Sequence, residues 1–125
     1  MKKDNTARYT VRQMRAVLFE ADPLLVVRFW EYHRAHPEVF EAFCARAREM
    51  RDAGRKRYSA WGIVQRIRWE HDIQQGTESF KINNDFIGLF SRLLVHVDPS
   101  FEGFFQHRAM KPDDRRVSGE ERYRQ

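Results

Sequence analysis

The centre of the chain carries basic side chains whose spacing suits contact with phosphate groups. Arg48, Arg51 and Arg55 recur at i, i+3 and i+7, so a helix would present them on one side. The segment Arg55-Lys56-Arg57 continues this run. Between residues 44 and 69 there are eight Lys or Arg and two acidic residues, a local charge of +6. Guanidinium groups match phosphate geometry, so this Arg-rich ridge predicts a surface that binds a polyanion.

Three residues beyond Arg57 could extend the surface: Arg68, Asn84 and Arg92. Asn and Arg side chains are the ones that read adenine and guanine edges. The helices expected after Ser59 and after Asn84 have a helix-turn-helix outline. About ten residues separate them, however, whereas the motif has a turn of about three or four. The simpler alternative is a solvated Arg-rich face, with Asn83 or Asn84 merely capping a helix and Arg92 an ordinary surface residue. If about five or six phosphates are contacted, a plot of the logarithm of the binding constant against the logarithm of the salt concentration should have a slope of about −5.

An enzymatic interpretation would use the carboxylates and imidazole of Glu70, His71, Asp72 and Asp85. Such groups could hold Mg²⁺ for phosphodiester cleavage. Their spacing does not favour this in a helix, where Glu70 and Asp72 are about 200° apart around the axis. The sequence also has no Gly-rich phosphate loop and no nucleophile elbow. We therefore expect no enzyme, no metal and no cofactor, with a metal-dependent nuclease kept as an alternative.

The aromatic and sulfur side chains have both packing and binding interpretations. Trp30, Trp61 and Trp69, with Tyr58, could stack on nucleic-acid bases because they are interleaved with arginines. We expect most of them in the core and keep a surface role open for Trp69. Cys44 is expected to be buried and inert, next to the apolar stripe of its helix.

Helical spacing of the apolar residues predicts a mainly α fold of about five helices. Thr10 and Gln13 form a capping box, and Asp22 followed by Pro23 gives a second helix start. Gly54 suits the end of the third helix, and Ser59 can cap the fourth. The predicted helices cover residues 10–20, 22–35, 37–53, 59 to about 70–73, and 85–97.

Between the fourth and fifth helices the hydrophobic period changes. Trp69, His71 and Ile73 alternate, residues 74–77 are turn-like, and Phe80 and Ile82 alternate again. This pattern predicts one small β-hairpin, which must lie on the helices because a lone hairpin is marginally stable. Phe101, Phe104 and Phe105 predict a further short apolar turn.

Length and composition limit the architecture. The 125 residues suffice for one domain, expected over 10–108, between a frayed N-terminus (1–9) and a mobile charged tail (109–125). One cysteine excludes an internal disulfide and a Cys-based zinc site. No apolar run approaches membrane-spanning length, and Met1 is followed by polar residues rather than a signal-like segment. We expect a soluble, cytoplasmic protein with no membrane partner.

Several short stretches between about residues 37 and 108 occur in a distinctive order and spacing. They are Gly54-Arg55-Lys56-Arg57-Tyr58, Ile67-Arg68-Trp69-Glu70, Phe80-Lys81-Ile82-Asn83-Asn84, Arg92, Pro99, Gly103-Phe104-Phe105 and Arg108. Taken together, these stretches resemble a family of small, mostly uncharacterised proteins of bacteriophages and prophages, and Asp85 departs from the family's usual small polar residue. The resemblance implies a phage-derived gene expressed in a bacterial cytoplasm, and it implies no established activity.

These observations favour a phage-derived nucleic-acid-binding protein, with DNA as the expected ligand. The net charge of +5 fits a polyanionic partner. The expected contacts are Arg48, Arg51, Arg55, Lys56, Arg57, Arg68, Asn84 and Arg92. The alternative is a small phage protein that binds and inhibits or redirects a host protein. It could use either the basic ridge as a decoy or the acidic segment 19–43, which has two basic and five acidic residues, a local charge of −3.

Overall fold

A computed structural model describes residues 5–75 and 82–105, and within these ranges the regular structure is entirely helical. Three short 3₁₀ turns accompany the α-helices: Thr6–Arg8, Asn84–Phe86 and Pro99–Phe101. No strand occurs in the described ranges. The five helices are α1 (Val11–Val17), α2 (Pro23–Ala35), α3 (Pro37–Asp52), α4 (Ala60–Gln75) and α5 (Ile87–Val97).

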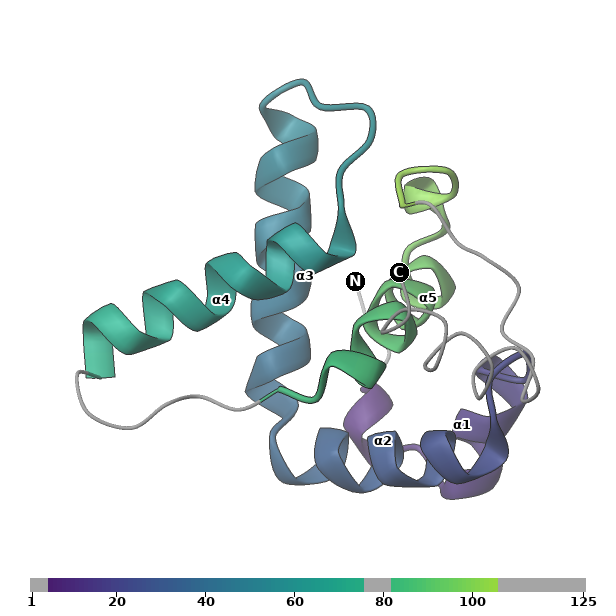
Figure 1. Cartoon of the computed structure of the whole chain (residues 1–125). Coiled ribbons are helices and arrows are strands. Elements are labelled where there is room, and N and C mark those ends of the chain that lie inside the picture. The colour runs from purple at the N-terminus through teal and green to yellow at the C-terminus, as the bar shows by residue number, and fades with distance from the viewer. Residues whose placement is uncertain (1–4, 76–81, 106–125) are drawn as a thin grey trace, which may run out of the picture.

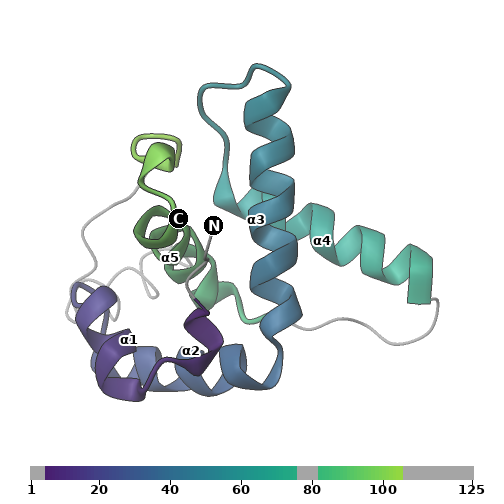
Figure 2. The same ribbon diagram turned by 180° about the vertical axis from the view of Figure 1, so that it is seen from behind.

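α5 packs against α3 and α4, and α4 extends beyond the other helices (Figure 1). α1 packs on α2, and α3 leaves the end of α2 in a different direction. α4 crosses α3, and its C-terminal part projects away from the other helices in both views (Figures 1 and 2). No helix among the described residues is long and apolar enough to cross a membrane.

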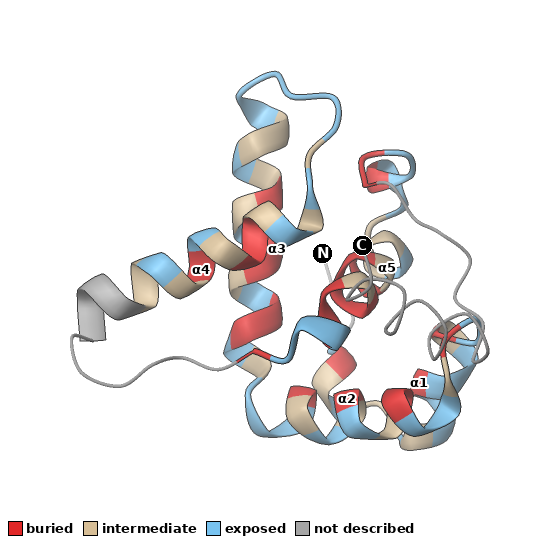
Figure 3. Ribbon diagram, in the orientation of Figure 1, coloured by how far each residue is buried: buried red, intermediate tan, exposed pale blue. Residues whose placement is uncertain are grey.

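The core is built around the phenylalanine side chains of α2, α3 and α5. Phe90 is fully buried, and its ring centroid lies 5.0 Å from that of Phe29 and 5.7 Å from that of Phe43. Burial of each such side chain stabilises the fold by about 1.5–3 kcal/mol. Leu89, Leu93 and Leu94 of α5 are also fully buried. All five helices contribute to this cluster, and Figure 3 shows the buried residues in red.

Local sequence signals set most helix starts as predicted. The Thr10 side chain accepts from the backbone N–H of Gln13, whose side chain accepts from the N–H of Thr10, so the capping box is confirmed. Asp22 accepts from the N–H of Leu25, and Pro23 occupies the first turn of α2. Phe101, Phe104 and Phe105 are buried, and a 3₁₀ turn ends at Phe101.

The first strand of the predicted hairpin is wrong, because α4 continues through Gln75 and includes Trp69, His71 and Ile73. The helix is favoured by an i, i+4 ion pair between Arg66 and Glu70, whose atoms lie 2.9 Å apart. Ile82 is buried but belongs to no strand. Phe80 and most of the predicted turn lie outside the described residues.

Residues 1–9 were expected to be frayed, but residues 5–9 are ordered against the helices. Thr6–Arg8 form a 3₁₀ turn, and Thr6 is buried. The side-chain oxygen of Thr6 lies 2.7 Å from Nε2 of His33, a hydrogen bond that holds this segment on α2. The predicted tail 109–125 and residues 1–4 lie outside the described ranges.

Candidate nucleic-acid interface

The basic turn between α3 and α4 is fixed by backbone hydrogen bonds. Gly54 follows the C-terminal cap of α3, and its φ of 98° lies in the left-handed region that glycine adopts without strain. The N–H groups of Gly54 and Arg55 donate to carbonyls in the last turns of α3, at 2.9 and 3.1 Å. Further on, the N–H of Tyr58 donates to the carbonyl of Phe104 at 3.1 Å. The turn is therefore attached to the core at both ends.

The Tyr58 ring also holds the basic turn against the start of α4. A Cβ at Gly62 would lie 3.2 Å from the ring, so the close approach depends on a residue without a side chain. The Ser59 hydroxyl accepts from the N–H of Gly62 at 3.0 Å, which confirms Ser59 as the predicted cap of α4.

Arg55, Lys56 and Arg57 are the exposed part of the predicted ridge. The guanidinium carbon of Arg55 lies 5.2 Å from the centre of the Tyr58 ring, a distance that allows a cation–π contact. None of the three residues forms an ion pair with a carboxylate in the described part of the chain. Three adjacent positive charges therefore remain available on this turn.

Arg48 and Arg51 point instead toward the turn that follows α5. Arg51 donates to the Ser100 hydroxyl at 2.7 Å, and its guanidinium carbon lies 4.1 Å from the centre of the Phe101 ring. Arg48 lies 3.9 Å from the carboxylate of Asp98. Hydrogen bonds from Ser100 hold the pKa of Asp98 below its usual range, and the charges of Arg51 and Arg48 act in the same direction. Two arginines of the predicted ridge, Arg48 and Arg51, thus make contacts within the fold.

Arg68 and Asn84 are brought together, although they are 16 residues apart in the chain. The Arg68 guanidinium donates to Oδ1 of Asn84 at 2.8 Å and to the backbone carbonyl of Ile82. Both partners are neutral, so Arg68 keeps its net positive charge. Asn83 is the residue that caps the following turn, through a hydrogen bond from the N–H of Asp85.

Arg92 lies apart from the basic turn and is largely covered. Its side chain is 12% exposed and lies 3.7 Å from the carboxylate of Glu20. It also donates to the carbonyl of Gly88 at 3.3 Å. Burial lowers the pKa of this guanidinium, and Glu20 acts against that shift. Arg92, which was predicted to approach bases, therefore contacts Glu20 in the segment after α1.

Four charged residues of α3 and α4 neutralise one another. Arg46 contacts Glu49 and Glu70 at 2.7 and 2.9 Å, and Arg66 contacts the same two carboxylates at 3.9 and 2.9 Å. Burial acts to raise the pKa of Glu70, but the two arginines hold it below its usual value. Glu70 is thus occupied by ion pairs. Among the described residues, no group of three His, Cys, Asp or Glu could hold a metal ion.

Most of the tryptophans were predicted to lie in the core, but two of the three are exposed. Trp30 is partly buried and its Nε1 donates to the carbonyl of Tyr9 at 2.7 Å. Trp61 and Trp69 are 58% and 62% exposed. The core assignment is wrong for Trp61, and a helical projection could have shown this, because Trp61 and Trp69 lie opposite the buried residues Ile63 and Ile67.

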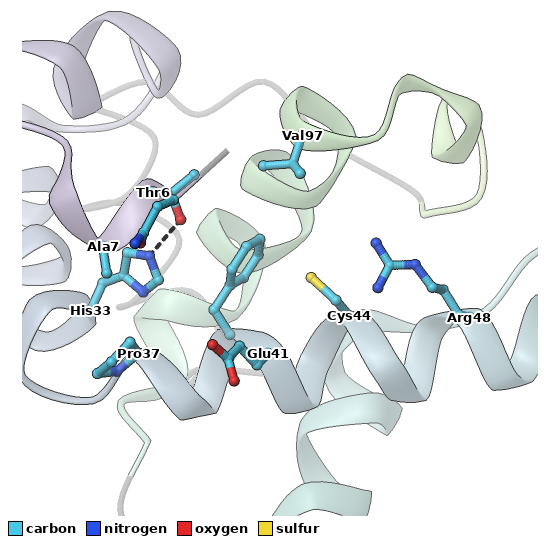
Figure 4. A pocket seen from close by; sticks show the side chains of 10 residues that line it. Thr6, Ala7, His33, Pro37, Glu41, Cys44, Arg48 and Val97 are labelled. Atoms are coloured by element: carbon cyan, nitrogen blue, oxygen red, sulfur yellow. Dashed lines mark hydrogen bonds between the residues drawn. The ribbon is translucent and has the colours of Figure 1, made fainter. Parts of the chain in front are cut away.

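A separate cavity of about 450 Å³ lies between the N-terminal turn and α3 (Figure 4). His33 and Cys44 are buried in its wall, and the exposed Glu41 and the partly buried Arg48 also line it. Nδ1 of His33 is buried and has no hydrogen-bond partner among the described residues. Burial lowers the pKa of His33 to about 4, so the ring is neutral at pH 7.

Comparison with family models, curated proteins and solved structures found no protein similar to this chain. The fold and the contacts of the described residues therefore carry the functional argument alone.

Proposed function

We propose that this chain is a nucleic-acid-binding protein of phage origin and that the basic turn Arg55-Lys56-Arg57 contacts phosphates. One observation carries the proposal: three adjacent cations are exposed on a turn that the core holds in place, and no carboxylate of the described residues pairs with them. Guanidinium and ammonium groups presented in this way suit contact with a phosphate backbone.

Arg68 is a fourth cation of the proposed interface, because its hydrogen bonds to Asn84 and Ile82 leave its charge uncompensated. Arg51 adds positive potential, but its side chain is directed to Ser100 and Phe101. Arg48 and Arg92 approach carboxylates and are left out of the contact set. The proposal does not use a helix-turn-helix, since residues 76–86 separate α4 from α5.

The direct test removes the three cations of the basic turn. Arg55, Lys56 and Arg57 are changed together to Gln, and binding to nucleic acid at low salt is measured by mobility shift. The matched control changes Arg12, Arg15 and Arg28 to Gln, three exposed arginines of α1 and α2, so both variants lose the same charge. We expect binding to be lost in the turn variant and retained in the control. Equal loss in both variants would show an effect of net charge alone.

A second candidate function, binding to a host protein, is favoured by an apolar corner between α1 and α2. Phe19 and Leu24 are 75% and 72% exposed there, beside the acidic residues Glu20 and Asp22. Large exposed apolar side chains with charged neighbours are typical of protein interfaces. The test compares capture of a host protein by the wild-type chain with capture by a Phe19→Ser, Leu24→Ser variant. Capture that survives both substitutions excludes this corner.

A further inference from the structure

The outer face of α4 presents two indole rings that nothing in the described part of the chain covers. Trp61 and Trp69 are more than half exposed, on the side of the helix opposite Ile63 and Ile67. They are eight residues apart, about 12 Å along the helix axis at ~1.5 Å per residue. Gln65 lies between them on the same side of the helix.

These two tryptophans differ from Trp30 in having no internal role. Trp30 donates a hydrogen bond to Tyr9 and lies 4.7 Å from the guanidinium carbon of Arg34. Trp61 and Trp69 have no hydrogen bond or ring contact with any described residue. Large aromatic side chains gain most from being covered, so two of them on one exposed helix face indicate a surface for a ligand.

The charges beside the rings identify the class of ligand. The basic turn Arg55-Lys56-Arg57 immediately precedes α4, so its cations lie near the Trp61 end of the face. Arg68, whose charge is not neutralised, is adjacent to Trp69 in the chain. Cations beside exposed aromatic rings match a polyanion that carries flat, stackable groups.

We propose that the outer face of α4 binds single-stranded nucleic acid, with bases stacked on Trp61 and Trp69. The phosphates then contact Arg55, Lys56, Arg57 and Arg68, so the inference rests on the proposed function and specifies its ligand. Bases in a duplex are already stacked on one another, so only an unpaired strand can present base faces to indole rings. The C-terminal part of α4 projects away from the other helices (Figures 1 and 2), and both rings are more than half exposed.

The test compares three ligands that share phosphate charge but differ in available bases. An oligothymidine, an abasic strand of the same length and a mixed-sequence duplex are each titrated with the full chain, using fluorescence anisotropy. We expect the oligothymidine to bind most tightly. Trp61→Ala and Trp69→Ala should each weaken its binding about tenfold and leave abasic binding unchanged. Phe19→Ala, which removes an exposed ring elsewhere, should change none of these affinities.

The outcomes separate this inference from the function on which it rests. If the abasic strand binds as tightly as the oligothymidine, stacking is refuted, while the phosphate contacts of the basic turn stand. If none of the three ligands binds, the proposed function fails as well. Binding to vesicles of phosphatidylserine in place of all three ligands would identify the face as a membrane contact and overturn the inference. Thermal melts of both alanine variants check that the fold is kept.

Discussion

Arg68 of α4 donates a hydrogen bond to Oδ1 of Asn84, which begins the 3₁₀ turn before α5, at 2.8 Å. Both residues were predicted as separate contacts to nucleic acid, and the fold pairs them with each other. The same guanidinium reaches the carbonyl of Ile82. One side chain thus connects α4 to the segment that leads into α5, and no carboxylate of the described residues forms an ion pair with it.

The pairing of Arg68 with Asn84 predicts energetic coupling between the two side chains. In a double-mutant cycle of Arg68→Ala and Asn84→Ala, urea unfolding should give a coupling energy of about 1 kcal/mol. Arg68→Ala should cost more than Asn84→Ala, because it also removes the hydrogen bond to Ile82. Strictly additive effects would show that the contact does not contribute to stability.

Arg92 should matter for folding and not for binding. Arg92→Ala removes a largely covered side chain and its contacts with Glu20 and Gly88, so the free energy of unfolding should fall by about 1–3 kcal/mol. At a temperature where the variant is folded, its affinity for nucleic acid should equal that of the wild type. An unchanged urea midpoint together with weaker binding would show that Arg92 contacts the nucleic acid and does not stabilise the fold.

Gly54 should be needed for the conformation of the basic turn. Its φ of 98° is unfavourable for residues with a Cβ, so Gly54→Ala should lower the free energy of unfolding by about 1 kcal/mol. No atom lies within 4 Å of the Cβ position, so the cost is conformational and not a clash. Gly54→Asn should cost less, because Asn tolerates the left-handed region. Chemical denaturation of the two variants measures the difference, and equal stability of wild type and Gly54→Ala would contradict this view of the turn.

His33 should make the stability of the fold depend on pH. Burial lowers its pKa to about 4, whereas the unfolded chain protonates near the usual 6.5. The unfolded state therefore binds the proton first, and the stabilisation present above pH 6.5 is lost as the pH falls toward 4. The loss amounts to about 3 kcal/mol. Glu41 and Arg48 are the charged residues that line the same cavity.

The contribution of His33 can be isolated with His33→Gln, which does not titrate. Urea midpoints of this variant should change much less between pH 6.5 and 4.5 than those of the wild type. The carboxylates with lowered pKa, Glu70 and Asp98, lose their stabilising contribution only at lower pH, so they do not obscure this range. Parallel pH profiles for variant and wild type would show that His33 is not the titrating group.

Local signals allowed most of the fold to be predicted. The Thr10 capping box, Asp22 with Pro23, and Gly54 each act within a few residues, and each lies where the sequence placed it. The first strand of the hairpin was predicted wrongly because the alternation of Trp69, His71 and Ile73 is too short to distinguish a strand from a helix. Ion pairs of Glu70 with Arg46 and Arg66 then favour the helix, and the pair with Arg46 joins residues distant in sequence.

The candidate site was predicted only in part for a similar reason. Arg55, Lys56 and Arg57 are exposed because they form a short turn, which their sequence indicates. The positions of Arg51 and Arg92 depend on Ser100 and Glu20, which are far away in the chain, and no local pattern encodes such contacts.

The most direct test of the proposed interface is the salt dependence of binding to single-stranded nucleic acid. Four cations, Arg55, Lys56, Arg57 and Arg68, at about 0.7 per phosphate contact give a log–log slope of about −3, shallower than the sequence alone predicts. Replacing the three cations of the basic turn with Gln should reduce the slope to about −1, and replacing Arg12, Arg15 and Arg28 should leave it unchanged. A slope near zero for the wild type, or the same slope for both triple variants, would contradict the account.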